Sequence, residues 1–295
     1  MTTREQGFLL LTSSLGDPQR KSLSLHQFRT LILRSKKYPK LRNASTVTLE
    51  DMAAMGYDRK MAERVVYLFS QREQMMGYVK AGEKQGCSLV GLTNPDYPIR
   101  LAYRLDMDTS TVLWTKGDKT LLQKPAIALV GSREGREENM EFAHEVGRLA
   151  AKLGYVLVSG NARGADRTAQ NACLAAGGQV ISVVADRLTE QTGDKNVLYI
   201  SEDGFDLPFS SRRALLRNRI IHALGEKTFV AQSEYGRGGT WDGTVKNLRH
   251  GWSPVYCFHD GSRAAAEFGT MGAGLITIKE IKTAIETQRK GEDFI

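Results

Sequence analysis

The sequence has 295 residues, enough for about two domains, and its 41% hydrophobic and 25% charged residues are typical of a globular protein. A total of 41 Lys and Arg against 33 Asp and Glu gives a net charge of +8, which favours a polyanionic partner. No apolar stretch approaches the roughly 18 residues that a membrane-spanning helix needs, and no secretion signal opens the chain. We therefore expect a cytoplasmic protein with no membrane partner.

The three cysteines, Cys87, Cys173 and Cys257, stand far apart in the sequence. They form no C-x-x-C pair, and no histidine lies at a metal-ligand spacing from them. We therefore predict buried, reduced thiols, with no metal site, no disulfide framework and no cofactor.

Residues 1–86 have the pattern of a small all-helical domain. Ser24 can cap a helix that runs to Lys37, and Thr48 with Asp51 resembles a capping box at the start of another. A longer helix is predicted from Asp58, because apolar residues then recur at helical spacing: Met61, Val65, Leu68, Met75, Met76 and Val79.

Residues 87–295 alternate short apolar runs with helical segments, which predicts an α/β domain. The runs are continuous, as in strands buried on both faces of a parallel sheet. They are 127–130, 155–158, 180–184, 228–231 and 255–258, and the helical segments between them include 138–153, 166–176 and 211–224. The fold expected is an extended Rossmann-like parallel sheet covered by helices on both faces.

Two glycine-bearing turns follow neighbouring predicted strands. One is Gly131-Ser132-Arg133, and the other is the segment 159–166, Ser-Gly-Asn-Ala-Arg-Gly-Ala-Asp. The carboxyl ends of parallel strands are where open α/β sheets bind ligands, and glycine lets the backbone approach an anion closely. We therefore predict phosphate recognition, with side-chain donors from Ser132, Ser159 and Arg133.

Neither turn has the glycine spacing of a dinucleotide-binding motif or of a P-loop, so the sequence supports neither of these two kinds of site. Taken alone, each glycine turn has the ordinary alternative of a tight connection from strand to helix. Asp166 has a similar alternative as the N-cap of the next helix.

Four arginines lie on the predicted helix 211–224, which should turn Leu216, Ile220 and Leu224 toward the sheet. Arginine pairs bidentately with phosphate, so the cluster favours an anionic ligand over a merely solvated face. The four are Arg212, Arg213, Arg217 and Arg219. Arg289 lies outside every motif and is expected to contribute nothing to binding.

Over residues 89–260 the chain resembles the DNA-processing protein A (DprA/Smf) family. The resemblance rests on motifs in the family's order: 96–98 (Asp-Tyr-Pro), 112–117 (Val-Leu-Trp-Thr-Lys-Gly), 131–133 (Gly-Ser-Arg), 159–166 (Ser-Gly-x-Ala-x-Gly-x-Asp), 201–202 (Ser-Glu) and 217–221 (Arg-Asn-Arg-Ile-Ile). The segment 1–86 is similar to the family's small SAM-like or helix-hairpin-helix domain.

The resemblance implies a protein that binds single-stranded DNA cooperatively, forms a homodimer and helps to load a RecA-type recombinase, without a catalytic reaction. It implies DNA and phosphate contacts at Gly131, Ser132, Arg133, Ser159, Gly160, Arg163, Gly164, Asp166, Arg217, Asn218 and Arg219. We expect no C-terminal winged-helix domain in this chain.

Some positions depart from the family pattern: Asn161, Gln170 and the loop 236–240. That loop, with Gly243-Thr244, faintly resembles the glycine loop of the related phosphoribohydrolases, whose chemistry needs a well-placed carboxylate. Only Asp242 is near, displaced in spacing. Two alternatives to a DNA-binding protein therefore remain: a nucleotide N-glycosidic-bond hydrolase and a sensor of a small nucleotide.

Overall fold

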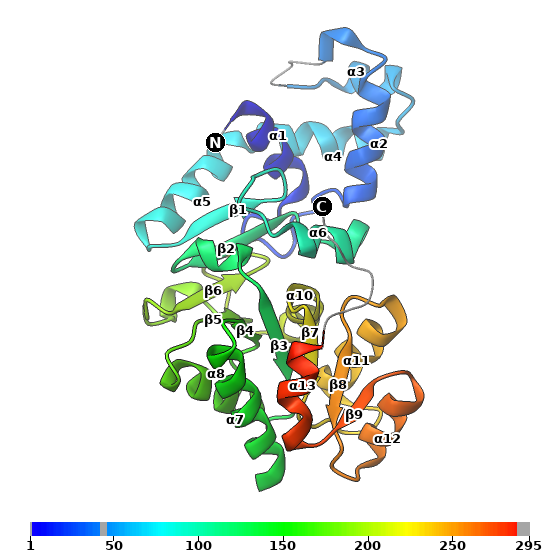
Figure 1. Cartoon of the computed structure of the whole chain (residues 1–295). Helices are drawn as coiled ribbons and strands as arrows, with labels where there is room; N and C mark the ends of the chain where they lie inside the picture. Colours follow the sequence, from blue (N-terminus) through cyan, green and yellow to red (C-terminus); the bar gives the residue numbers. More distant parts are fainter. Residues whose placement is uncertain (1, 42–45, 288–295) are drawn as a thin grey trace. The chain divides into compact units, whose positions relative to one another are not determined.

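The structure is a computed structural model that describes residues 2–41 and 46–287. The chain divides into two compact units (Figure 1). The first comprises residues 1–116, 186–191 and 200–208, and the second comprises residues 117–185, 192–199 and 209–295.

The first unit contains helices around one antiparallel strand pair. Its elements are α1 (Thr3–Thr12), α2 (Leu25–Ser35), α3 (Leu49–Ala54), α4 (Arg59–Ser70), α5 (Arg72–Lys84), β1 (Ser88–Gly91), α6 (Ile99–Leu105) and β2 (Val112–Lys116), with short 3-10 helices at Pro39–Leu41, Asp106–Asp108 and Leu188–Glu190.

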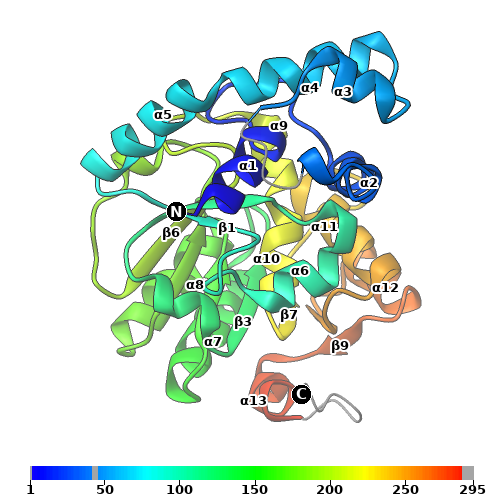
Figure 2. The same cartoon turned by 90° about the horizontal axis from the view of Figure 1, so that it is seen from above.

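The predicted helix starts in this unit are confirmed at Ser24 and Thr48. Each forms a reciprocal capping box, in which Thr48 and Asp51 exchange hydrogen bonds of 3.1 Å in both directions. The helix predicted from Asp58 is instead two helices, α4 and α5, which follow one another in Figure 2. The chain leaves helical geometry at Gln71, so that Leu68 and Met75 can enter different apolar clusters.

The first unit extends beyond residue 86 because strand β2 packs against α5. The indole of Trp114 on β2 is fully buried, with its ring 5.2 Å from Tyr78 and 5.0 Å from Phe205. Gly82 leaves room for this ring, since a Cβ there would lie 2.6 Å from it. The domain boundary after residue 86 stays a prediction, and the compact unit itself runs to Lys116.

The second unit is built on parallel strands. Its elements are β3 (Ala126–Val130), α7 (Glu137–Lys152), β4 (Val156–Ser159), α8 (Ala165–Ala175), β5 (Val180–Val183), β6 (Val197–Ser201), α9 (Ser211–Leu216), α10 (Asn218–Leu224), β7 (Lys227–Val230), α11 (Gly238–His250), β8 (Val255–Phe258), α12 (Arg263–Thr270), β9 (Gly274–Ile276) and α13 (Ile281–Glu286), with 3-10 helices at Lys119–Gln123 and Ile278–Glu280.

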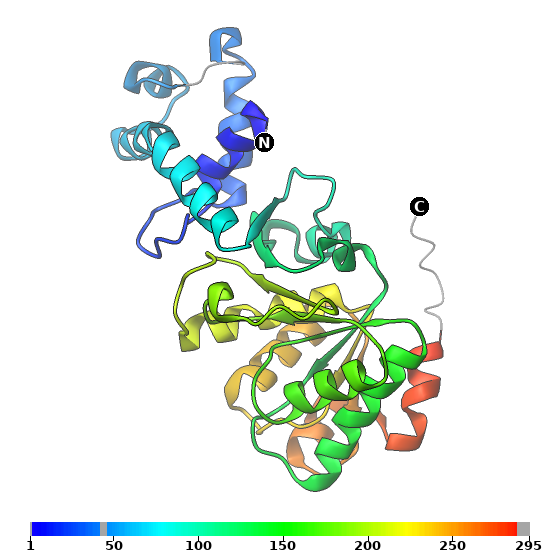
Figure 3. The same cartoon turned by 90° about the vertical axis from the view of Figure 1, so that its left-hand side faces the viewer.

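The strand order β6-β5-β4-β3-β7-β8-β9 places β4 and β7 on opposite sides of β3. Helices α7, α8 and α13 cover one face, and α10, α11 and α12 cover the other (Figures 1 and 3). The predicted Rossmann-like fold is therefore confirmed. The order reverses between β3 and β7, which is the switch point where such sheets open a crevice for ligands.

Two sequence predictions inside this unit are wrong. The helix expected over 211–224 is interrupted at Arg217, where the amide of Ile220 bonds to the Arg217 carbonyl across a tighter turn. Leu216, expected to face the sheet, is 42% exposed, whereas Ile220 and Leu224 are buried as predicted. Because the helix is interrupted, α9 and α10 are two separate short helices, and α9 does not continue the buried face of α10.

The three cysteines are buried free thiols, as expected.

Candidate phosphate-binding site

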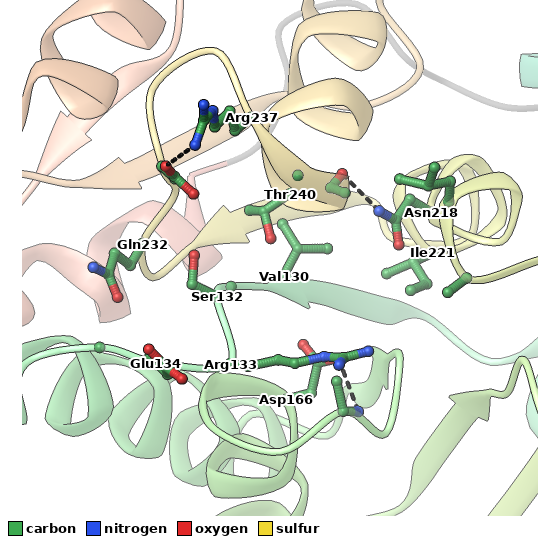
Figure 4. A pocket seen from close by; sticks show the side chains of 18 of the residues that line it. Val130, Ser132, Arg133, Glu134, Asp166, Asn218, Ile221, Gln232, Arg237 and Thr240 are labelled. Carbon is green, nitrogen blue, oxygen red and sulfur yellow. Dashed lines mark hydrogen bonds and ion pairs between the residues drawn. The ribbon is translucent and has the colours of Figure 1, made fainter. Parts of the chain in front are cut away.

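A cavity of about 890 Å³ opens where strands β3 and β7 end (Figure 4). Three groups of residues line it: 130–136 with Ala162 and Asp166, then Phe209, Ser211, Ala214, Leu215, Arg217, Asn218 and Ile221, then Gln232, Glu234 and 237–240. All belong to the second unit. The cavity therefore lies at the switch point that the strand order defines.

The turn after β3 forms one wall of the cavity. A Cβ on Gly131 would lie 2.4 Å from the Cβ of Ala165, so only glycine lets the turn approach helix α8 so closely. The Ser132 amide donates to the Gln232 carbonyl at 3.1 Å, which ties this turn to the end of β7. Arg133 leaves the turn with an exposed side chain, its guanidinium 5.9 Å from the ring centre of Phe209.

The N-terminus of helix α11 forms the opposite wall. Its first residues, Gly238, Gly239 and Thr240, line the cavity, and its N-cap Arg237 makes no side-chain capping bond. The first amides of a helix lack partners within the helix and carry the positive end of its dipole, so they favour an anion. Ser132 and Thr240 lie on facing walls in Figure 4.

Helix α10 is fixed to α11 by two sets of hydrogen bonds. Asn218 donates to the Gly239 carbonyl at 2.6 Å, beside the cavity. Deeper in the core, the ring Nδ1 of His222 lies 3.0 Å from Asn247 Nδ2, and Asn247 also bonds to Ser253. Burial lowers the pKa of His222 to about 3, so the ring is neutral. These contacts hold both helices of this wall in one arrangement.

The second glycine loop has a different arrangement, because Asp166 fills it. The Asp166 carboxylate accepts from the Ala162 amide at 3.2 Å and from the Gly160 backbone. It is thus an internal anion in the first turn of helix α8, and the N-cap of that helix is Gly164, so the alternative N-cap role of Asp166 is wrong. Two amides of this loop, those of Gly160 and Ala162, are therefore already bonded within the protein.

Asp166 and Arg217 lie on the same side of Gly160. A Cβ on Gly160 would be 2.8 Å from Asp166 Oδ2 and 2.8 Å from Arg217 Nη2. Burial raises the pKa of the Asp166 carboxyl to about 6, and the positive charge of Arg217 opposes that shift. Arg217 is also held by a 2.8 Å hydrogen bond to the Val183 carbonyl on β5.

The structure brings together six of the predicted site residues in the cavity wall: Gly131, Ser132, Arg133, Asp166, Arg217 and Asn218. The other five do not line it: Ser159, Gly160, Arg163, Gly164 and Arg219.

Gly160 lies against Asp166 and Arg217, and the reasons differ among the other four residues. Ser159 is fully buried, and its hydroxyl accepts from Gln170 at 2.8 Å. Gly164, with φ +81°, packs on the turn after β3, since a Cβ there would lie 2.4 Å from the Arg133 carbonyl. Arg163 is exposed outside the cavity, and Arg219 bonds to the Leu216 carbonyl. Ser159 therefore cannot reach a ligand in this arrangement.

Sequence reasoning missed the contribution of the loop after β7. Gln232 and Glu234 follow the predicted strand 228–231 directly, so the rule applied to the two earlier strands would have found them. Phe209 and Leu215 carried no such signal, because they reach the cavity from a segment before α10. Arg136 and Arg237 also line the wall, and each pairs with a glutamate.

The carboxylates near the cavity bear on the hydrolase alternative. Glu134, Asp166 and Glu234 line the cavity. Asp242, the candidate that follows the glycine loop, does not line it and pairs with Lys246 at 2.7 Å. Across residues 2–41 and 46–287, no three or more His, Cys, Asp or Glu side chains gather as metal ligands would.

Across residues 2–41 and 46–287, every helix is also too short or too polar to cross a membrane.

The sheet and its cavity define a Rossmann-like α/β protein whose switch point is lined by arginines and backbone amides. The family model described as DNA recombination-mediator protein A matches residues 88–277. The chain therefore belongs to that family, and the resemblance to the DprA/Smf proteins is confirmed.

Individual relatives agree with this assignment. The DNA processing protein DprA of Bacillus subtilis is 30% identical over 169 residues, which is 54% of this chain and 56% of the relative. This chain spans about half the length of the curated relatives it matches.

Two solved structures share the fold. That of Streptococcus pneumoniae DNA processing protein A is 23% identical with a TM-score of 0.67, over 98% of this chain and 99% of that one. That of the Helicobacter pylori protein is 22% identical with a TM-score of 0.57, over 68% of this chain and 96% of that one.

Proposed function

We propose that this chain is a DNA-processing protein that binds single-stranded DNA through its phosphates in the switch-point cavity. One observation carries the proposal: Ser132 lies opposite the N-terminus of α11 in the cavity, and the Arg133 side chain lines the same cavity. A phosphate between these walls would receive a hydroxyl, a guanidinium and helix amides together. The Helicobacter pylori relative is described as binding single-stranded DNA, which supports this choice of ligand.

Family membership supports a role for the bound complex in recombination. We propose that the protein forms a homodimer and that its DNA complex assists the loading of a RecA-type recombinase. The net charge of +8 agrees with a polyanionic partner of this kind.

Affinity measured against strand length and salt tests the binding mode. Labelled oligothymidylates of increasing length should bind more tightly with each added phosphate until the site is filled. Affinity should fall by orders of magnitude between about 50 and 200 mM salt if several phosphates are engaged, because bound counterions are released. Saturation by a mononucleotide would instead indicate a nucleotide sensor, and a flat salt dependence would contradict phosphate binding.

We propose binding without catalysis. The hydrolase alternative needs a well-placed carboxylate, and Asp242, the candidate that follows the glycine loop, is engaged with Lys246 outside the cavity. Incubation with nucleoside monophosphates should therefore release no free base, as followed by chromatography. Sustained release that disappears in Asp242→Asn would establish the hydrolase and remove the proposal.

A further inference from the structure

A second surface, beside the cavity, is formed by Tyr235, Trp241 and Arg263, which we call the Tyr235 platform. Tyr235 stands between the cavity-lining residues Glu234 and Arg237, and Trp241 follows Thr240, which also lines the cavity. The loop that shapes the cavity on one side therefore shapes this platform on the other. It is also the loop that departs from the family pattern.

The platform is a series of planar groups, each packed on the next. The Arg263 guanidinium lies over the Tyr235 ring, 3.8 Å from its centre. The Tyr235 and Trp241 rings meet edge to face at 4.9 Å, and Trp241 stacks on the fully buried Phe268, also at 4.9 Å. Phe268 anchors the stack in the core, so its outer surface is presented by a fixed support.

The outer layer of this stack is open to solvent. Arg263 is exposed and Tyr235 is 38% exposed. Within the described part of the chain, no carboxylate lies within ion-pair distance of Arg263. Arg263 is also the first residue of α12, where a positive charge opposes the helix dipole. The position of this arginine is therefore not explained by stability of the helix or by a charge partner.

We propose that the Tyr235 platform stacks a nucleobase of the single strand whose phosphate occupies the cavity. Guanidinium planes and aromatic rings are the surfaces on which unpaired bases stack, and every base offers a flat face. The inference rests on the proposed function, because the strand reaches the platform from the cavity. It assigns this loop a role in holding bases, where the cavity holds phosphates.

Arg263→Lys is the decisive variant, because it keeps the charge but loses the planar group. Its affinity should be compared with wild type for dT12 and for a fully abasic strand of the same length and charge. Wild type should prefer dT12, and the preference should fall roughly fivefold or more in Arg263→Lys and in Tyr235→Ala, in line with the usual contribution of one stacked base. Affinity for the abasic strand should change less than about twofold, and Tyr235→Phe should behave as wild type.

Each other outcome has one meaning. If the variants weaken both strands equally, the platform contacts phosphate only and the inference fails. If wild type binds both strands alike, the platform is wrong while phosphate binding stands. If wild type binds neither strand, the proposed function fails and the platform with it. Thermal melting of each variant separates these results from loss of folding, and Arg263→Lys preserves the N-terminus of α12 even if Tyr235→Ala loosens the loop.

Discussion

The two glycine loops of the second unit begin alike and end differently. Both follow buried parallel strands, β3 and β4, and both place glycine at the carboxyl edge of the sheet. The turn after β3 opens into the cavity, whereas in the loop after β4 the amides of Gly160 and Ala162 are bonded to Asp166. A glycine turn at a strand end is therefore a ligand site only where the protein has not supplied its own anion.

The loop after β4 also supports the turn after β3. Gly164 lies against the carbonyls of Ser132 and Arg133, and Asp166 lies beside Arg217. The loop after β4 therefore supports the residues that face the ligand. If this comparison is correct, substitutions in the turn after β3 should mainly lower DNA affinity, whereas substitutions in the loop after β4 should mainly lower stability.

The largest effect is expected from Gly164→Ala. Its φ of +81° already strains an alanine, and the added Cβ would lie 2.4 Å from the Arg133 carbonyl. Strain and overpacking together should cost roughly 2–5 kcal/mol of unfolding free energy, measured by urea denaturation. Single-strand affinity should fall as well, because the Arg133 backbone must move.

Gly177→Ala is the matched control for that variant. Gly177 has a φ of +79°, but nothing lies within 4 Å of its added Cβ. It should therefore lose only about 1–2 kcal/mol of stability and keep its affinity for DNA. Equal losses in the two variants would show that Gly164 does not support the first loop.

The next effect concerns Arg133, whose side chain we expect to contact the ligand without contributing to the stability of the fold. Arg133→Ala should reduce single-strand affinity roughly tenfold to a hundredfold, since a charged hydrogen bond contributes about 1.5–3 kcal/mol. Its side chain is exposed, so the melting temperature should change little.

Arg249→Ala is the control for Arg133, because Arg249 is exposed in the last turn of α11, at the end away from the cavity. Its affinity should change less than about threefold. Arg289 lies outside the described residues and is less suitable. Equal affinities of the folded Arg133→Ala and Arg249→Ala variants would mean that phosphate does not bind at this turn.

A comparable effect, on stability and dependent on pH, is expected from Asp166. Its pKa is raised to about 6 in the folded protein, from an ordinary value near 3.8. The folded state thus holds this proton more tightly than the unfolded chain does, so the associated stability is complete below about pH 4 and is lost as pH rises to about 6. The loss should be on the order of 3 kcal/mol, since each pKa unit corresponds to about 1.4 kcal/mol.

Comparing wild type with Asp166→Asn isolates this contribution from that of other carboxyl groups. The difference in unfolding free energy between the two proteins should change between about pH 4 and pH 6 and stay constant above pH 7. A difference that is independent of pH over this interval would contradict the raised pKa. Denaturant titrations at successive pH values provide the measurement.

The sequence predicts β3, β4, β5, β7 and β8 because these strands are short continuous apolar runs that are buried throughout or nearly so. It did not predict β6 and β9. It predicts Ser132 and Arg133 in the cavity wall for the same reason, since both directly follow such a run. It could not separate Ser132 from Ser159, because that difference depends on Gln170, which approaches Ser159 only after α8 has packed on the sheet. The break at Arg217 was equally hidden, since the arginine keeps helical dihedral angles there.

The smallest predicted effects come from these two serines, and together they test the comparison most directly. Ser132→Ala should lower DNA affinity by about twofold to tenfold and leave stability unchanged, because a neutral hydrogen bond contributes about 0.5–1.5 kcal/mol. Ser159→Ala should leave affinity unchanged and cost about 1 kcal/mol of stability, because Gln170 Nε2 loses a buried acceptor 2.8 Å away. Urea denaturation and single-strand titration of both variants give four values. If Ser159→Ala weakened DNA binding as much as Ser132→Ala while remaining equally stable, the loop after β4 would also contact the ligand, and the distinction between the two loops would be lost.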